Sequence, residues 1–197
     1  MTIKVYEVDR HGLTRVLRPE APVIPVVTVD RTAAFPVLDG VLTRLVPTTE
    51  GDVDLLAQWF ASPDFVEHWG GVPISRAEVA EKYVGRRRPR VESFLVLAES
   101  TPVGYAQYWR DGVAEGGIDM VLEPEARGRG LGPDAARVLL AHLGGDLGWR
   151  RVTVDPAREN LRAIRGWEKA GFRQVPSAGE DLLMEFRFPE GRLKRLG

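Results

Sequence analysis

Residues 127–133 read Arg-Gly-Arg-Gly-Leu-Gly-Pro and lie between a strand-like stretch and a helix-like stretch. Glycine tolerates positive φ angles and lets the backbone approach a ligand closely. Backbone N–H groups at a helix N-terminus attract anions, and Pro133 fits a first helical turn. The two arginines add positive charge. The stretch predicts a loop that binds phosphate groups, although a purely structural turn would have the same composition.

The spacing of these glycines excludes two common nucleotide-binding motifs. The loop of P-loop nucleotidases needs Gly-Lys-Ser/Thr four residues after a first glycine, and the chain has no such pattern. A dinucleotide fingerprint counted from Gly128 would need glycine where Pro133 stands. The preceding strand also belongs to a run of strands and does not open a βαβ unit.

The rest of the chain alternates between the two apolar periods that distinguish strands from helices. Three successive strands without intervening helices indicate an antiparallel meander before the glycine-rich loop. The order of elements predicts an α+β fold with a mixed sheet. Strands are expected at residues 41–46, 94–98, 103–109, 117–122, 151–154, 172–175 and 182–188, and helices at 53–61, 75–83, after the loop as far as Leu143, and at 160–170.

The first forty residues differ from the remainder. Alternating residues 3–8, a turn at 9–12 and residues 13–17 predict a hairpin. Four prolines follow by residue 36, which disfavours a helix or a central strand. We expect residues 1–40 to form an N-terminal hairpin and arm, and residues 41–197 to form the main domain.

Composition narrows the class of protein. The 197 residues carry a formal net charge of −1, which argues against binding nucleic acid by bulk charge. The absence of cysteine excludes disulfides, thiolate catalysis and zinc–thiolate sites, and no metal site is expected. No apolar stretch reaches the roughly 18 residues of a membrane span, and the N-terminus lacks a secretory signal pattern. We expect a cytoplasmic protein that does not bind a membrane.

Two blocks of sequence resemble the GCN5-related N-acetyltransferase (GNAT) family. Residues 127–132 match its pyrophosphate loop, Gln/Arg-x-x-Gly-x-Gly/Ala, and residues 154–172 resemble its Asn-x-x-Ala…Tyr-x-Lys-x-Gly-Phe segment. The resemblance covers roughly residues 41–188. It implies the GNAT fold, which is a mixed, bent sheet flanked by about four helices. The sheet splays open between its fourth and fifth strands, here residues 117–122 and 151–154.

Further segments resemble one subgroup of that family. Residues 55–71, 102–107, 117–119 and 160–165 look like aminoglycoside 6′-N-acetyltransferases. The same subgroup includes acyltransferases of siderophore biosynthesis, which act on a hydroxylysine-type amine. The resemblance implies an enzyme that transfers an acetyl group from acetyl-CoA to a primary amine of a small molecule. Two alternatives stay open, namely a siderophore-type acyltransferase and a non-catalytic module that binds acetyl-CoA.

The resemblance also implies how the cofactor lies. Its pantetheine arm would occupy the splay and bond to the fourth strand, its pyrophosphate would lie on the glycine-rich loop, and its thiol end would approach the last helix. The residues implied in binding it are Met120, Val121, Leu122, Arg127, Gly128, Arg129, Gly130, Leu131, Gly132, Pro133, Asn160, Ala163 and Trp167.

On the acceptor side, the resemblance gives Asp119 the role of general base and Asp155 that of holding a cationic substrate. Both also fit simpler roles, Asp119 as a rim carboxylate and Asp155 in an Asp-Pro turn. Trp69 and Tyr83 match positions that shape the substrate pocket, although aromatic residues also build cores. Tyr105 and Gln107 point to one face of their strand, either the pocket or the core.

Two departures from the family pattern affect this reading. Trp167 stands where the family has the tyrosine proposed as general acid, and an indole cannot act as one. The loop between Trp109 and Gly117 is short and carries only two acids, Asp111 and Glu115. The related aminoglycoside enzymes have a longer, acid-rich insertion there, which leaves the acceptor open. The expected partner is a small amine, and the protein is expected to be a monomer or a homodimer.

Overall fold

A computed structural model of the chain describes residues 6–8, 14–16, 36–177 and 182–189. The chain divides into two compact units, Met1–Phe35 and Pro36–Gly197. In the first unit, β1 (Tyr6–Val8) pairs antiparallel with β2 (Thr14–Val16), which is the predicted hairpin. The remainder of the predicted arm up to residue 35 lies outside the described residues. The expected boundary between an N-terminal arm and a main domain at residue 40 stays a prediction.

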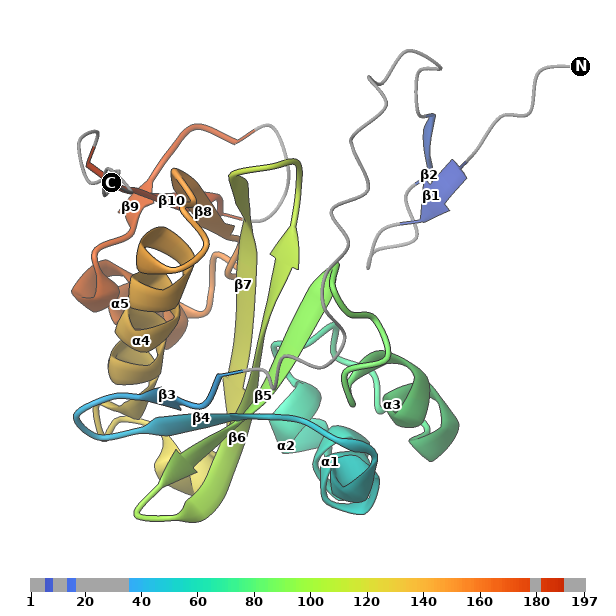
Figure 1. Ribbon diagram of the computed structural model, residues 1–197. Helices are drawn as coiled ribbons and strands as arrows, with labels where there is room; N and C mark the ends of the chain where they lie inside the picture. Colours follow the sequence, from blue (N-terminus) through green and yellow to red (C-terminus); the bar gives the residue numbers. More distant parts are fainter. Residues whose placement is uncertain (1–5, 9–13, 17–35, 178–181, 190–197) are drawn as a thin grey trace, which may run out of the picture. The chain divides into compact units, whose positions relative to one another are not determined.

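The second unit is built on one sheet with the strand order β3-β4-β5-β6-β7-β8-β10-β9 (Figure 1). All neighbouring strands pair antiparallel except β7 and β8, which are parallel, so the predicted mixed sheet is confirmed. The strands are β3 (Leu38–Asp39), β4 (Arg44–Pro47), β5 (Val91–Ala98), β6 (Thr101–Arg110), β7 (Glu115–Leu122), β8 (Arg151–Val154), β9 (Arg173–Gln174) and β10 (Met184–Arg187).

The sheet begins earlier than the sequence indicated. Leu38 of β3 pairs with Leu45 of β4, whereas the sequence placed the start of the main domain near Val41. A strand of two residues is too short to show the alternation that reveals strands in a sequence. Val41 instead lies in the exposed turn between β3 and β4.

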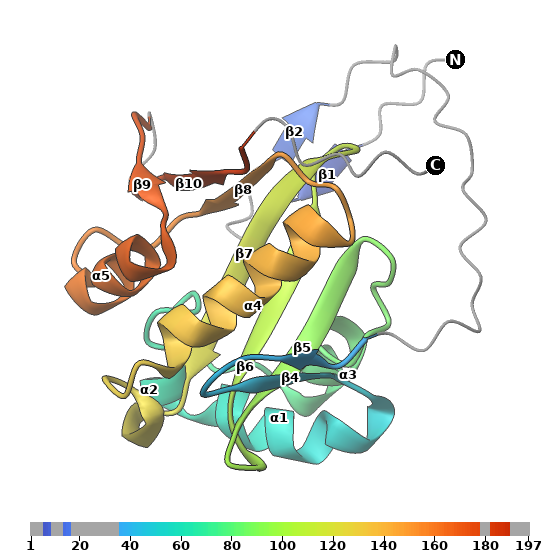
Figure 2. The ribbon, with the colours of Figure 1, turned by 60° about the vertical axis from the view of Figure 1, so that its left-hand side comes forward.

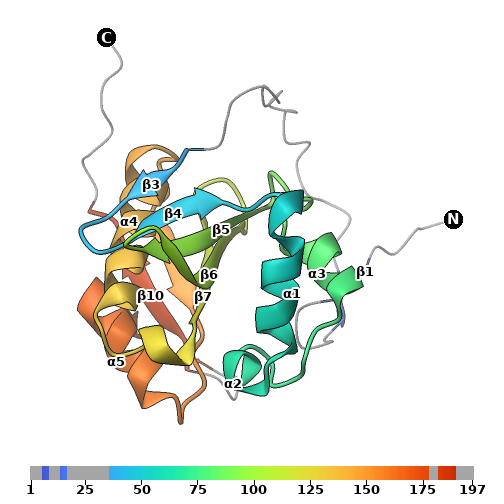
Figure 3. The ribbon, with the colours of Figure 1, turned by 90° about the horizontal axis from the view of Figure 1, so that it is seen from below.

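Helices cover both faces of the sheet. α1 (Val53–Ala61), α2 (Pro63–Val66) and α3 (Arg76–Lys82) lie on one side, and α4 (Leu131–Gly145) and α5 (Leu161–Ala170) lie on the other (Figures 1 and 3). Each side has its own apolar cluster. The sequence did not predict α2, because four residues carry no helical period. Pro63 at its start is typical of a first helical turn. None of the described helices has the length and apolar character needed to cross a membrane.

The parallel pair β7–β8 holds together only at its beginning. Its register includes Glu115 opposite Arg151, Gly116 opposite Val152 and Gly117 opposite Thr153. β7 continues to Leu122 along β6, whereas β8 turns away from it (Figure 2). The strands therefore diverge over Ile118–Leu122, which is the splay that the family resemblance implied.

A buried aspartate fixes the β3–β4 turn to the first turn of α4. Oδ2 of Asp134 accepts hydrogen bonds from the N–H groups of Leu42 and Thr43, both at 2.9 Å, and from Oγ1 of Thr43 at 2.8 Å. Burial by itself raises the pKa of Asp134, but these hydrogen bonds outweigh it and hold the pKa below its usual value. The charged form of Asp134 therefore stabilises the junction beside the glycine-rich loop.

We predict that Asp134→Ala lowers the free energy of unfolding by about 3 kcal/mol at neutral pH, because it leaves buried donors without an acceptor. The pKa of Asp134 is lower in the folded than in the unfolded chain, so its stabilisation is full above pH ~4. It declines as the pH falls through the folded-state value. Urea unfolding at pH 7 and at progressively lower pH measures the difference between the two proteins.

Asp54→Ala is the matched control, because Asp54 is an exposed carboxylate whose ion pair with Arg76 contributes little. Its free energy of unfolding should stay within ~0.5 kcal/mol of the wild type. Equal stability of Asp134→Ala and Asp54→Ala at pH 7 would contradict the anchoring role.

Candidate active site

The meander brings two polar side chains together beside the splay. Gln107 of β6 lies opposite Asp119 of β7 in the strand register, and its Nε2 donates a hydrogen bond of 2.9 Å to Oδ2 of Asp119. Gln107 is buried and Asp119 is half-buried. One carboxylate is therefore held in a fixed place on β7 where that strand leaves β8.

A chain of hydrogen bonds continues from Gln107 into the protein. The Tyr105 hydroxyl lies 2.9 Å from Oε1 of Gln107 and 2.7 Å from Oγ of Ser93. Because Oε1 can only accept, Tyr105 gives it its single proton, and Ser93 then donates to Tyr105. Each hydrogen bond thus orients the side chain that makes the next one, and the last of them orients Asp119. The sequence analysis missed Ser93, although its place on the neighbouring strand opposite Gln107 gives it this contact.

Aromatic rings surround the inner end of this chain. Phe60 stacks on Tyr83 at 4.5 Å, and Tyr105 lies edge-on to Trp69 at 5.7 Å and to Tyr83 at 5.4 Å between ring centroids. Nε1 of Trp69 donates to the Tyr83 hydroxyl at 3.2 Å. Tyr83 and Tyr105 are buried and support the site, whereas Trp69 is half-buried. Four of the predicted acceptor-side residues are thereby brought together, namely Trp69, Tyr83, Tyr105 and Gln107.

Burial sets the protonation of the two phenols. It raises the pKa of Tyr105 well above its usual value, and it raises the pKa of Tyr83 despite the hydrogen bond from Trp69. Both hydroxyls therefore stay protonated at neutral pH. Tyr105 is kept as a hydrogen-bond donor to Gln107 and cannot act as the general base.

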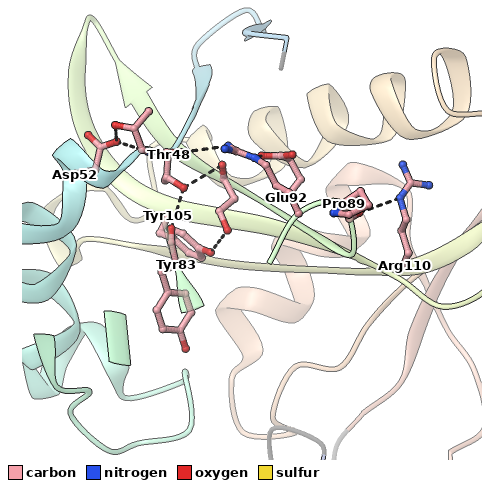
Figure 4. A network of polar contacts seen from close by, with 10 residues as sticks. Thr48, Asp52, Tyr83, Pro89, Glu92, Tyr105 and Arg110 are labelled. Carbon is pink, nitrogen blue, oxygen red and sulfur yellow. Dashed lines mark hydrogen bonds and ion pairs between the residues drawn. The ribbon is translucent and has the colours of Figure 1, made fainter. Parts of the chain in front are cut away.

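A second polar network holds the C-terminal end of α3 against the sheet (Figure 4). Oγ1 of Thr48 donates to the carbonyl of Tyr83 at 2.8 Å. Arg88 donates to the buried carboxylate of Glu92 at 2.6 Å and to the carbonyl of Thr48 at 3.1 Å. Burial raises the pKa of Glu92, while Arg88 opposes this. The network fixes Tyr83, on which Trp69 rests.

Asp155 lies directly after β8, on the other side of the splay. Gly117 opposes Thr153 in the parallel register, and Asp119 and Asp155 each follow by two residues. Alternation along β7 places Asp119 on the face covered by α1–α3, and Asp155 is the first residue after β8. Asp155 is half-buried, like Asp119. The two acids flank the opening between the strands.

The glycine-rich loop is arranged as its composition predicted. Gly128 and Gly130 have φ angles of 78° and 83°, and Gly130 is the residue before α4. A β-carbon on Gly128 would meet no other atom within 4 Å, so the loop is open on that side. Leu131, Gly132 and Pro133 form the first helical turn, whose N–H groups favour anions. This geometry suits a phosphate or pyrophosphate.

The two arginines of the loop differ in their surroundings. Arg127 donates to the carbonyls of Leu122 at 3.0 Å and of Asp64 at 2.8 Å, and so ties α2 to the end of β7. Arg129 is exposed. Arg127 therefore shapes the loop by these two bonds, and Arg129 is the arginine placed at the surface.

Residues of α5 complete the opposite wall. Oδ1 of Asn160 accepts from the N–H of Ala163 at 3.0 Å and so caps the helix. A hollow of about 250 Å³ brings Asn160 together with Arg127 and His68. Trp167 packs edge-on against Phe172 at 5.2 Å, next to the core on the α4 side. Met120 and Leu122 of β7 are half-buried beside the same core, and Val121 faces the α1–α3 cluster.

No group of three or more metal-binding side chains forms within the described residues. The site offers instead an anion loop, a gap between two strands and a pair of carboxylates. These features fit a phosphate-bearing ligand on the loop and a cationic group beside the carboxylates.

Comparisons with known proteins agree with this geometry. Residues 43–173 match the model of the acetyltransferase (GNAT) domain. The aminoglycoside N(6′)-acetyltransferase type 1 of Klebsiella pneumoniae is 33% identical over 153 residues, which are 69% of this chain and 75% of that protein. A kanamycin resistance protein of Rhizobium radiobacter is 38% identical over 71 residues, which are 34% of this chain and 66% of that protein.

Solved structures show the same fold. The aminoglycoside acetyltransferase AAC(6′)-Ib in complex with paromomycin and acetyl-CoA aligns with a TM-score of 0.66 and 29% identity, covering 74% of this chain and 93% of that one. Spermidine N-acetyltransferase from Vibrio cholerae aligns with a TM-score of 0.65 at 16% identity, covering 74% of this chain and 95% of that one, which shows the fold alone. The matched domain spans the meander, the glycine-rich loop and α5, and the chain belongs to the GNAT acetyltransferase family.

Proposed function

We propose that this protein transfers the acetyl group of acetyl-CoA to a primary amine of an aminoglycoside. The observation that carries the proposal is the carboxylate of Asp119, held by Gln107 on the strand that borders the splay. Relatives at 33% identity are named for this reaction, and AAC(6′)-Ib has been solved with acetyl-CoA and with kanamycin.

The described residues offer a fitting place for acetyl-CoA. Pyrophosphate would lie on the N–H groups of residues 128–132, beside the exposed Arg129. The pantetheine arm would follow the free edge of β7 at Met120–Leu122, where β8 has turned away. Asn160 and Ala163 lie on the opposite wall, next to the hollow that contains Arg127.

The chemistry then needs three events. Asp119 takes a proton from the ammonium group of the acceptor, directly or through one water, so that a neutral amine is formed. The amine nitrogen attacks the thioester carbonyl, and backbone N–H groups of β7 that face the splay stabilise the oxyanion. The C–S bond breaks and CoA leaves as a thiolate, which takes the second proton from the acetylated nitrogen, so that the neutral amide and the CoA thiol are formed. Trp167 supplies no proton, because an indole N–H is not a useful acid.

The charges around the opening favour a cationic acceptor of limited charge. Asp119 lies on β7 and Asp155 follows β8, and the short β6–β7 turn has no acid-rich insertion. Of the two acids between Trp109 and Gly117, Glu115 is already paired with Arg151 at 3.2 Å. We therefore expect acceptors with fewer amines to be used relatively well. Hydroxylysine in the same assay panel tests the siderophore-type alternative.

We predict that Asp119→Asn lowers kcat with an aminoglycoside acceptor by at least about 100-fold, because the amide cannot accept the ammonium proton. The KM for acetyl-CoA should change less than about twofold, since Asp119 does not face the phosphate loop. Thiol release from acetyl-CoA, measured with a panel of kanamycin, ribostamycin, hydroxylysine and spermidine, gives both constants. Wild-type turnover on hydroxylysine alone would reject the aminoglycoside proposal, and full activity of Asp119→Asn would reject its role as base.

The hydrogen-bond chain makes a second prediction. Tyr105→Phe removes the proton that orients Gln107, and we expect kcat to fall about tenfold while the KM for acetyl-CoA is unchanged. Tyr108→Phe is the matched control, because Tyr108 is a buried tyrosine of the same strand that faces the α4 side. Burial raises the pKa of Tyr108 to about 12, so it too carries a neutral hydroxyl. Equal losses in the two variants would show that Tyr105 acts through stability alone.

A further inference from the structure

Trp109 covers Gly117, the second of the two adjacent glycines that lie between the β6–β7 turn and Asp119. It lies opposite Gly117 in the strand register. A β-carbon added to Gly117 would lie 2.7 Å from Nε1 of Trp109 and in contact with the carbons of its ring. The indole therefore lies across the α-carbon of Gly117. Only glycine leaves room for the ring in this place.

Trp109 lies on the same face of the sheet as Gln107 and Asp119. Tyr105, Gln107 and Trp109 alternate along β6 and so point to the same side of the sheet. Gly117 and Asp119 have the same relation on β7, and their partners across the strands are Trp109 and Gln107. The Gln107–Asp119 pair consequently has an indole at each end, Trp69 next to Tyr105 and Trp109 over Gly117.

The two indoles differ in what packs on them. Trp69 packs against the apolar cluster of α1 and α3, in contact with Phe60 and Tyr105. Among the described residues, Trp109 belongs to neither apolar cluster, although it is half-buried against the sheet. Its ring therefore lies against Gly117, on the face of the sheet that carries Gln107 and Asp119, and is partly exposed.

We propose that Trp109 is a specificity-determining residue, whose indole is the platform for a saturated ring that carries ammonium groups. The face of an indole attracts cations and the C–H groups next to them. Asp119, two residues further along β7, then meets an amine projecting from the edge of that ring. The proposal rests on the proposed function and names the class of acceptor as a cyclic amine, such as an aminosugar.

The test compares Trp109→Ala and Trp109→Phe with the wild type, using kanamycin and acetyl-CoA. The KM for kanamycin should rise about tenfold in Trp109→Ala and by a smaller factor in Trp109→Phe, which keeps an aromatic face. The KM for acetyl-CoA and the melting temperature should stay close to the wild-type values. Val113→Ala is the control, because Val113 lies in the β6–β7 turn next to Trp109 and is 81% exposed. It should leave both KM values unchanged.

Gly117→Ala provides a second, independent variant. Its methyl group would push the indole off β7 while Trp109 itself remains in the chain. We expect the KM for kanamycin to rise as in Trp109→Ala. Tryptophan emission gives a further readout, because kanamycin has no aromatic group and any change comes from the indoles of the protein. Kanamycin should change the emission of the wild type, and this change should be lost in Trp109→Phe.

Two failures can be told apart. Wild-type turnover with kanamycin, together with an unchanged KM in both Trp109→Ala and Gly117→Ala, would overturn the platform and leave the proposed function in place. No wild-type turnover with any aminoglycoside would overturn the proposed function, and the assignment of Trp109 with it.

Discussion

The early end of the pairing between β7 and β8 is the constraint on which the site depends. Three residue pairs join the two strands, and beyond Gly117 and Thr153 they separate. A parallel sheet normally satisfies the N–H and C=O groups of both strands, but β7 has no pairing with β8 at Met120–Leu122, so a bound chain can pair with that edge. An extended amide-containing chain, such as pantetheine, has the hydrogen-bonding groups to replace the missing strand. The same separation leaves Asp119 and Asp155 on opposite sides of one opening.

The face of the sheet under α1–α3 does the positioning. Alternation along β6 and β7 places Tyr105, Gln107 and Asp119 on this face, where each hydrogen bond fixes the next group. The buried tyrosine contributes because burial raises its pKa and keeps its proton in place. The other face is mostly apolar and packs against α4, and none of the residues in this series of hydrogen bonds lies on it. One face of these strands thus positions the reactive groups, and the other face packs into the apolar core.

The sequence predicted most of the fold because its signals are local. The glycine-rich loop before a helix and the helix expected at residues 160–170 each depend on a few neighbouring residues, and both appear in the structure. The missed features depend on pairing across strands. The bond from Gln107 to Asp119 and the place of Trp109 over Gly117 follow from the β6–β7 register, which no single stretch encodes. Arg127 stays a predicted phosphate ligand, but its bond to the carbonyl of Asp64 depends on α2, a helix too short to predict, while its other bond is to the carbonyl of Leu122 in β7.

Hydrogen–deuterium exchange with and without acetyl-CoA tests most directly whether the free edge of β7 holds the acyl donor. The N–H groups of residues 118–122 that face the splay should exchange quickly in the free protein and slowly with saturating acetyl-CoA. Residues 128–132 should be protected in parallel, whereas the amides of β5, which is paired on both sides, should not change. Protection of the glycine-rich loop without any change at residues 118–122 would contradict the account, because the donor would then bind without entering the space between the strands.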